Sequence, residues 1–311
     1  MTFIDDIRSD GHAVESTCRV LREQGCPVAA RTYRAWKSRR VVAARTYRDA
    51  TVMDALIATR GTPEGLYGRR KMVAHLRRNG FGGLARCTVD QLMRDLHMVG
   101  VRRGKGIRTT IAAKGGDRAQ DLLKRDFTAP APNTRWIADF TYCRTWAGFV
   151  YVAFVVDMFA HKIVGWHAAT SKQTDLVLVP LRIAAWQRSR DGHPVQPGQL
   201  LHHRDAGSQY RSLRFTEHLA LEGIAPSIGT VGDAYDNGLM ESIIGLFKTE
   251  CIGTDVFHSR PYRTLADVEY ATAGWVDWYN HRRLHSTLGM VPPEEFEQAH
   301  YAALKPQEQP T

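Results

Sequence analysis

The pattern of apolar and polar positions divides the chain into a helical first part and a strand-rich second part. Helical periodicity predicts helices at residues 51–60, 66–79 and 88–99. In the third of these, Leu92, Met93 and Leu96 are expected to face inward, and Thr88 is expected to be the N-cap. Short helices joined by a glycine-containing turn, here at residues 80–83, are typical of a helix-turn-helix whose third helix enters a DNA groove.

From Trp136 onward the pattern indicates strands. The apolar runs FVYVAFVVDMFA and KIVGWHAAT lie close together in the chain, so we expect them to pair as antiparallel strands. The rest of the pattern predicts helices at 174–189 and 213–221, strands at LLHHRD and 225–228, and helices starting at 237 and 264. This order predicts a mixed α/β sheet covered by helices, as in an RNase H-like core.

The fold class expected is therefore α/β, with an RNase H-like mixed sheet as the core and a small all-α module of helix-turn-helix type before it. The segment VESTCRVLREQGCPVAARTYRAWKSRR favours a further helix pair that ends in a basic run. The regions expected are a basic helical segment (1–50), the helix-turn-helix-like module (51–104), a basic linker with glycine and proline (105–134), the catalytic core (135–297) and a tail (298–311).

Basic residues are concentrated near the start of the chain, which carries a formal net charge of +10 overall. Between Arg60 and Arg108 there are twelve Lys and Arg residues but only three acidic ones. Such an excess indicates a polyanion partner, since Lys and Arg that contact phosphates release counterions, although a basic face that is only solvated remains the alternative. The candidate DNA contacts here are Arg69, Arg70, Lys71, Arg86, Arg94, Arg102, Arg103 and Lys105.

Composition narrows the remaining function classes. No apolar run approaches the roughly 20 residues that span a bilayer, and the N-terminus MTFIDDIRSD is polar, so we expect a cytoplasmic protein, associated with the nucleoid, without a membrane partner. The five cysteines are scattered without a C-x-x-C pair, which indicates free thiols rather than disulfides or a thiolate zinc site.

One carboxylate stands out by its surroundings. In TRWIADFTY, Asp139 lies in a predicted strand with apolar neighbours on both sides, where an ionised carboxylate costs on the order of several kcal/mol unless a cation is beside it. Asp205, which ends LLHHRD, and Glu241, in YDNGLMES, are two further acidic candidates. Their separation of thirty-five residues is weak evidence by itself, because thirty-two acidic residues give many pairs at any spacing.

The surrounding blocks are more specific. WIADFTY, HHRDAGSQY, YDNGLMES and WYNHRRLHSTLGMVPPEEF resemble the signature blocks of DDE transposases and retroviral-type integrases, above all the second-frame (OrfB) product of bacterial insertion sequences of the IS-three type. The resemblance extends from the basic module to about Phe296. Departures at Leu284, where such proteins often have proline, and at Met290, where an aromatic is frequent, are peripheral to the chemistry.

The resemblance implies site residues and partners. It makes Asp139, Asp205 and Glu241 the catalytic triad and Lys248 the basic residue seven positions after the glutamate. It also implies cleavage and joining of double-stranded DNA at the terminal inverted repeats of an element and at a target. Further implied partners are copies of the chain on DNA, as a homo-oligomer, and an OrfA-type upstream-frame protein, either separate or fused.

The chemistry of the carboxylates supports a metal site independently. Carboxylates that converge from different elements repel one another unless divalent cations lie between them, and oxygen ligands favour Mg²⁺ or Mn²⁺ over zinc. Two such ions, roughly 3.5 to 4 Å apart, activate an attacking water or 3′-hydroxyl and stabilise the leaving 3′-oxygen. We expect Asp139 to bridge both ions, while Asp205 and Glu241 each complete one coordination shell.

Other residues invite competing interpretations. Asp157, at the end of FVYVAFVVD, is a rival metal ligand, although we expect it to cap the strand end or the next turn. His202 and His203 are adjacent on a predicted strand, so they point to opposite faces and are expected to be structural. Trp275 and Trp278 share a helical stripe, which indicates core packing rather than base stacking.

The helix that carries Glu241 has an unusual polar face. Gly238, Glu241, Gly245 and Lys248 recur at helical spacing, and the hypothesis is that the glycines let a DNA backbone approach closely, with tolerated glycines as the alternative. Further candidate DNA contacts are Asn237, before this helix, and Arg282 and Arg283, for which a solvated basic end is the alternative.

Three function classes remain. The first is a transposase that cuts element ends and joins the freed 3′-hydroxyl to target DNA. The second is a metal-dependent nuclease of the same fold, which a strand-transfer assay would separate from the first. The third is a non-catalytic DNA-binding repressor of transposition, which metal-dependent cleavage would exclude.

Overall fold

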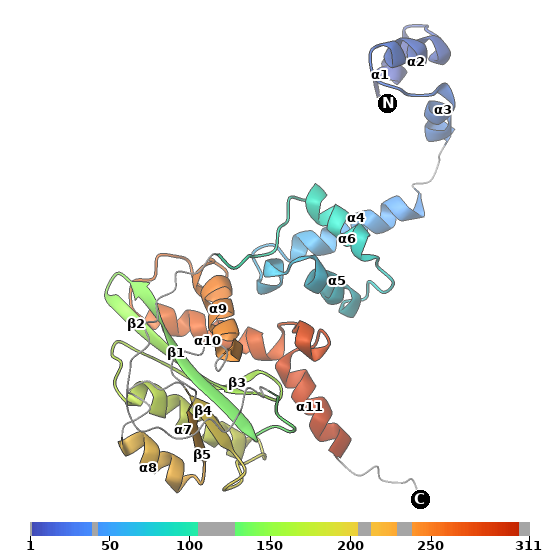
Figure 1. Cartoon of the computed structure of the whole chain (residues 1–311). Helices are drawn as coiled ribbons and strands as arrows, with labels where there is room; N and C mark the ends of the chain where they lie inside the picture. The colour runs from blue at the N-terminus through green and yellow to red at the C-terminus, as the bar shows by residue number, and fades with distance from the viewer. Residues whose placement is uncertain (1, 39–42, 105–127, 205–212, 229–237, 305–311) are drawn as a thin grey trace, which may run out of the picture. The chain divides into compact units, whose positions relative to one another are not determined.

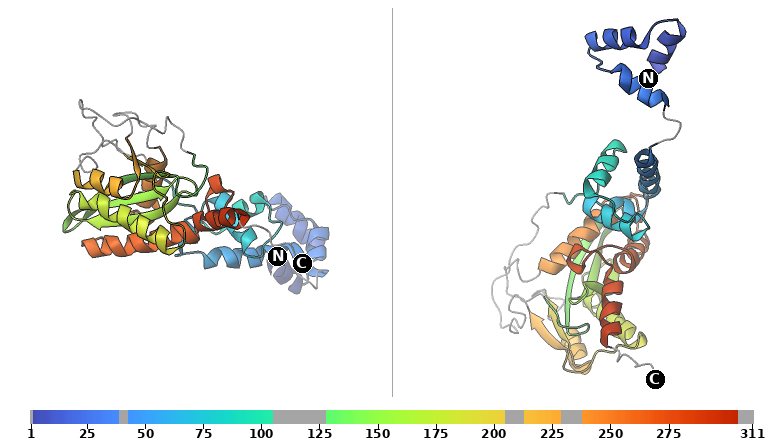
Figure 2. Two further views of the ribbon diagram at one scale, coloured as in Figure 1. Left: turned by 90° about the horizontal axis from the view of Figure 1, so that it is seen from below. Right: turned by 90° about the vertical axis from the view of Figure 1, so that its right-hand side faces the viewer.

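The computed structural model describes residues 2–38, 43–104, 128–204, 213–228 and 238–304, and it divides into two compact units, residues 1–55 and 56–311 (Figure 1). The first unit contains α1 (Thr2–Ser9), α2 (Val14–Glu23) and α3 (Ala30–Ser38). These helices form a small group of their own around Ile4, Cys18 and Tyr33 (Figure 2). The helix pair predicted here is therefore confirmed, as α2 and α3.

A helical module begins the second unit. It consists of the end of α4 (Ala44–Ala58), a 3₁₀ turn (Pro63–Leu66), α5 (Arg69–Arg78) and α6 (Arg86–Asp95). Leu92 and Met93 are buried as predicted, and Leu96 is half-buried. The predicted N-cap at Thr88 is wrong, because α6 already begins at Arg86, after Ala85 in an extended conformation that provides no side-chain cap.

The core is a five-stranded sheet in the order β3-β2-β1-β4-β5. Its strands are β1 (Arg135–Thr145), β2 (Gly148–Asp157), β3 (Lys162–Ala169), β4 (Leu201–Arg204) and β5 (Ala225–Ile228). The first three pair antiparallel, as predicted, whereas β4 joins β1 and β5 joins β4 in parallel. Because β4 and β5 are short, the β1–β2 hairpin extends past them (Figure 1).

Helices cover both faces of this sheet. In chain order they are α7 (Asp175–Arg190), α8 (Leu213–Leu221), α9 (Gly238–Leu246) with a π-helical continuation (Phe247–Ile252), α10 (Leu265–His281), a 3₁₀ turn (Ser286–Leu288) and α11 (Pro293–Leu304). One face packs Trp136, Ala138 and Val155 against α7 and α8. On the other, Phe154 of β2 contacts the rings of Phe247 and Trp275. The mixed α/β, RNase H-like core is thus confirmed.

Two of the expected domain boundaries fall inside helices. The division between residues 50 and 51 lies within α4, and the one between 297 and 298 lies within α11, where Glu297 is buried. Both helices keep their periodicity through the boundary, so the sequence gives no break there. The start of the core at Arg135 coincides with the start of β1. No helix in the described part of the chain has the length and apolar character needed to cross a bilayer.

Candidate active site

Asp139 lies in the middle of β1, at the level where that strand leaves its pairing with β4. It is half-buried, and its Oδ1 accepts a hydrogen bond from the backbone N–H of Phe140 at 2.8 Å. Its partner across β2 is Phe154, whose ring packs on Phe247 and Trp275. Directly opposite residues of paired strands share a face, so Asp139 lies on the face covered by the α9 and α10 segments.

Glu241 reaches the same region from a helix. It lies in the first turn of α9, it is exposed, and α9 packs against β1. Met240 and Ile243 are buried, as the predicted apolar stripe requires, so the helix is fixed on the sheet while Glu241 remains accessible.

Asp205 lies outside the described residues. It follows Arg204, the last residue of β4, and Arg204 pairs in parallel register with Ala138, the residue before Asp139. Within the described residues, no three His, Cys, Asp or Glu side chains are grouped so that they could hold a metal ion. The structure therefore brings the elements of Asp139 and Glu241 together and leaves the third expected ligand untested.

Gly245 lies against the side chain of Arg103. It is buried, and a Cβ placed there would lie 2.5 Å from Cζ of Arg103. The guanidinium of Arg103 also lies 3.5 Å from the backbone carbonyl of Glu241, within hydrogen-bonding distance. In the structure the end of an arginine side chain of the same chain fills the space beside this glycine, and the close approach of a DNA backbone stays a prediction.

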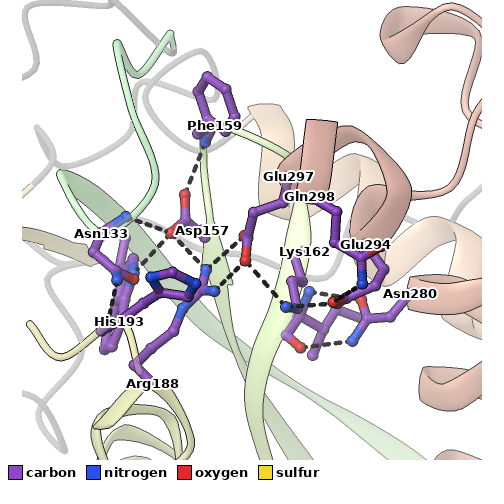
Figure 3. Close-up of polar contacts among 12 residues, drawn as sticks. Asn133, Asp157, Phe159, Lys162, Arg188, His193, Asn280, Glu294, Glu297 and Gln298 are labelled. Atoms are coloured by element: carbon purple, nitrogen blue, oxygen red, sulfur yellow. Dashed lines mark hydrogen bonds and ion pairs between the residues drawn. The ribbon is translucent and has the colours of Figure 1, made fainter. Parts of the chain in front are cut away.

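The rival carboxylate Asp157 is part of a buried ion cluster (Figure 3). Its oxygens accept hydrogen bonds from the backbone of Asn133 at 2.7 Å, the indole of Trp136 at 3.2 Å and the guanidinium of Arg188 at 2.9 Å. The backbone N–H of Phe159 donates to it as well, so Asp157 caps the turn after β2, as predicted. Burial raises the pKa of Asp157, and the charge of Arg188 offsets only part of this effect.

The remaining competing interpretations are also settled by burial. His202 and His203 are both buried, and His203 Nδ1 lies 3.0 Å from the hydroxyl of Ser227, which is consistent with structural roles. Trp275 and Trp278 are fully buried, so their predicted role in core packing is confirmed.

Comparison with known proteins identifies the family. A family model described as an HTH-like domain matches residues 48–106, and two models described as integrase core domains match residues 129–234 and 222–293. A putative transposase for the insertion sequence element IS986/IS6110 of Mycobacterium tuberculosis is 48% identical over 258 residues, which are 83% of this chain and 91% of the relative. The chain belongs to the insertion-sequence transposases.

Further relatives agree with this assignment. The transposase of IS629 from Shigella sonnei is 44% identical over 261 residues, covering 84% of this chain and 83% of the relative. Transposase InsF of IS3A from Escherichia coli is 29% identical over 296 residues, which cover 93% of this chain and 96% of the relative. A structure of the HTLV-2 integrase catalytic core in complex with magnesium has a TM-score of 0.41 at 16% identity, covering 54% of this chain and 98% of that one.

Membership in this family establishes a DDE transposase, an enzyme that binds DNA and catalyses polynucleotidyl transfer with a divalent metal ion. Most of the basic residues expected to contact DNA are exposed in the transposase: Arg69, Arg70, Arg86, Arg94, Arg102 and Arg103. Lys71 is an exception, because burial lowers its pKa to about 7 and leaves much of it uncharged at neutral pH. Lys105 and Asn237 lie outside the described residues.

Arg283 is a second exception and corrects a predicted DNA contact. It is buried and donates to both carboxylate oxygens of Glu250, at 2.6 and 2.9 Å. Burial alone would lower the pKa of Arg283, but the Glu250 carboxylate outweighs it and keeps the pKa above its usual value. Arg282, by contrast, is exposed and pairs with Asp277 at 3.3 Å.

The block around Arg283 joins the helical module of the transposase to its core. The hydroxyl of Tyr67 accepts a hydrogen bond from the backbone N–H of Leu284 at 3.0 Å. The indole N–H of Trp278 donates to Glu64 at 2.9 Å, and the ring of Trp278 stacks on that of Tyr67. These contacts give part of this sequence block a structural role.

Adjacent arginines provide a direct test of this correction. Arg283→Ala is expected to lower the free energy of unfolding by about 3 kcal/mol, because it leaves the buried Glu250 carboxylate without its cation. Arg282→Ala, at the exposed neighbour, is expected to change it by less than about 0.5 kcal/mol. Urea denaturation measures both values. A loss of DNA affinity in Arg283→Ala without any loss of stability would restore the DNA-contact interpretation.

Proposed function

We propose that Asp139, Asp205 and Glu241 are the catalytic carboxylates of this transposase and hold two Mg²⁺ or Mn²⁺ ions. The observation that carries the proposal is the packing of α9, which bears Glu241, against β1, which bears Asp139. The parallel pairing of β1 with β4 adds support, because Asp205 directly follows β4 in the chain. An all-carboxylate donor set fits hard divalent cations better than it fits zinc or copper.

The residues of the chain have distinct tasks in this site. When bound, divalent ions activate the attacking oxygen and stabilise the leaving oxygen at the phosphorus. β1 fixes Asp139, and the backbone N–H of Phe140 orients one of its oxygens. The rigid contact of Phe247 with Phe154 holds α9 on the sheet, so Glu241 keeps its position relative to Asp139. Lys248, exposed just after α9, would hold a phosphate of the DNA.

The substrate proposed is double-stranded DNA, with the terminal inverted repeats of an element as donor and a second site as target. The module at residues 51–104 would bind the element ends through its exposed arginines, the segment at 105–134 would link it to the core at 135–297, and residues 298–311 would form a tail. We further propose a homo-oligomer on DNA, an OrfA-type upstream-frame partner, and association with the nucleoid in the cytoplasm.

A strand-transfer assay tests the reaction. Oligonucleotide duplexes that carry the end of the element are incubated with the full chain, plasmid DNA and Mg²⁺. A transposase yields joined products, whereas a nuclease yields only shortened strands and a repressor leaves the DNA intact. In a second reaction the duplexes already carry a free 3′-hydroxyl at the end of the element. Shortened strands without any joined product from these duplexes would contradict the proposal.

The salt dependence of binding tests the proposed role of the helical module. Arg70→Gln and Arg86→Gln are each expected to reduce the slope of log affinity against log salt by about 1, because each removes one phosphate contact. Arg190→Gln, on α7, is the control and should leave the slope unchanged. Fluorescence anisotropy with duplex DNA at several salt concentrations measures the slopes. Equal slopes in all three variants would place the duplex elsewhere.

A further inference from the structure

The far half of the β1–β2 hairpin carries an aromatic face that the core does not cover. Tyr142 and Phe149 are 42% and 51% exposed, and their rings meet edge to face with centroids 5.4 Å apart. Across the hairpin, Tyr142 pairs with the half-buried Tyr151, and Phe149 pairs with the exposed Arg144. Because directly opposite side chains lie on one face of a hairpin, these four residues form a continuous surface.

Cations lie over the rings of this surface. The ammonium of Lys248 is 5.2 Å from the centre of the Tyr142 ring, and that of Lys172 is 5.1 Å from the centre of the Tyr151 ring. We call these six residues the aromatic–basic surface: Tyr142, Arg144, Phe149, Tyr151, Lys172 and Lys248. At the tip of the hairpin the same combination recurs, with Arg263 5.4 Å from the ring of Trp146, which is 73% exposed.

The surface adjoins the candidate active site. Tyr142 follows Asp139 by three residues, roughly 10 Å along the strand, and points to the opposite face of the sheet. β4 pairs with β1 only as far as Ala138, so within the described residues it covers none of the β1 edge beyond that point. Lys248 follows α9, which packs against β1, and its ammonium lies over the ring of Tyr142. The side chain of Lys248 therefore links the α9 segment to the aromatic–basic surface.

We propose that the aromatic–basic surface binds unpaired nucleotides of the DNA strand beside the cleaved phosphodiester. This inference rests on the proposed function. Tyr142 and Phe149 stack on the bases, and the cations of Lys248, Lys172 and Arg144 meet the phosphates. Exposed rings combined with basic side chains are the features by which proteins hold single strands without reading their sequence.

The charge and the rings together favour this occupant over two others. In a duplex the faces of the bases are already stacked on one another, so exposed rings would gain little from it, whereas unpaired bases offer free faces. A second copy of the chain would have to bring its own Lys248, Lys172 and Arg144 against these, and like charges at a protein interface disfavour association. A polyanion, by contrast, is attracted by the same three cations.

A binding assay without divalent metal tests the surface separately from the reaction. The full chain is titrated into a labelled oligothymidylate of about 16 nucleotides and, separately, into a labelled duplex of the same length. Tyr142→Ala/Phe149→Ala is expected to weaken single-strand binding about tenfold or more and duplex binding by less than about twofold. Tyr142→Phe/Phe149→Tyr, which keeps both rings, should bind as the wild type does.

Further variants control for folding and for general loss of surface. Tyr270→Ala removes a tyrosine on α10 that is 72% exposed and should leave both affinities unchanged. Arg144→Glu tests the same surface without touching a ring and should also weaken single-strand binding. The melting temperature of each variant is measured to confirm that it is folded.

The outcomes separate this inference from the proposed function. Unchanged single-strand affinity in the folded double variant, or in Arg144→Glu, would overturn the inference even if the wild type joins DNA. Equal losses for single strand and duplex would overturn it too, as would loss of self-association with single-strand affinity intact. A wild type that binds oligothymidylate through these rings but neither cuts nor joins would contradict only the proposed function.

Discussion

Asp139→Asn and Glu241→Gln are each expected to reduce DNA cleavage and strand joining by at least about 10³-fold. The amide keeps the shape of the side chain but removes the negative charge that holds the metal ions. The loss of transition-state stabilisation is on the order of several kcal/mol, and each 1.36 kcal/mol corresponds to about tenfold in rate. Asp205→Asn is expected to have the same effect. Single-turnover assays with element-end duplexes in Mg²⁺ measure both steps.

Matched substitutions at exposed acidic residues serve as controls. Asp191→Asn, after α7, and Glu217→Gln, on α8, remove the same charge from elements that carry none of the three candidate carboxylates, and both should retain full activity. All variants should keep the melting temperature and duplex affinity of the wild type. Activity within about tenfold of wild type for any one member of the triad would exclude that residue as a metal ligand.

Arg188→Met is expected to lower the free energy of unfolding by about 5 kcal/mol, the largest effect on stability that we expect from a single substitution. The guanidinium is 2% exposed and binds two buried carboxylates, Asp157 at 2.9 Å and Glu297 at 2.8 Å (Figure 3). Removing it leaves two buried negative charges, and Lys162 is a second cation beside Glu297, at 3.2 Å. Methionine keeps the apolar stem of the side chain, so most of the loss comes from the missing guanidinium. Urea denaturation followed by circular dichroism measures the change.

Two further variants test this explanation. Arg190→Met, two residues later on the same helix, removes an arginine whose side chain is 62% exposed and should change stability by less than about 0.5 kcal/mol. Adding Asp157→Asn and Glu297→Gln to Arg188→Met removes both stranded charges and should recover part of the loss. Equal losses for Arg188→Met and Arg190→Met would show that the ion cluster does not stabilise the fold.

The same cluster predicts a dependence on pH. Burial alone would raise the pKa of Glu297, but Arg188 and Lys162 hold it below its usual value. A carboxyl group with a lowered folded-state pKa stabilises the protein above its unfolded pKa and loses this contribution as the pH falls. The stability difference between the wild type and Arg188→Met should therefore shrink below about pH 4.5. A difference that grows toward acid pH would contradict the assigned charge states.

The sequence determined most elements of the fold, because hydrophobic periodicity reports which side of each segment faces a core. The predicted strand at 225–228 is β5, and the predicted helix at 213–221 is α8. The apolar stripe with Met240 and Ile243 faces the sheet as expected. The signature blocks also identified the family, because each block is continuous in the chain and the blocks keep their order and spacing.

Tertiary structure alone decided which charged groups meet. Asp157 and Arg188 are thirty-one residues apart in the chain, and Arg283 and Glu250 are thirty-three apart. The local sequence does not distinguish the buried Arg283 from the exposed Arg282. It does not show whether the partner of an arginine is a phosphate or a carboxylate that is distant in the chain. Such pairs depend on the packing of whole elements, so the DNA contact expected at Arg283 could be corrected only in three dimensions.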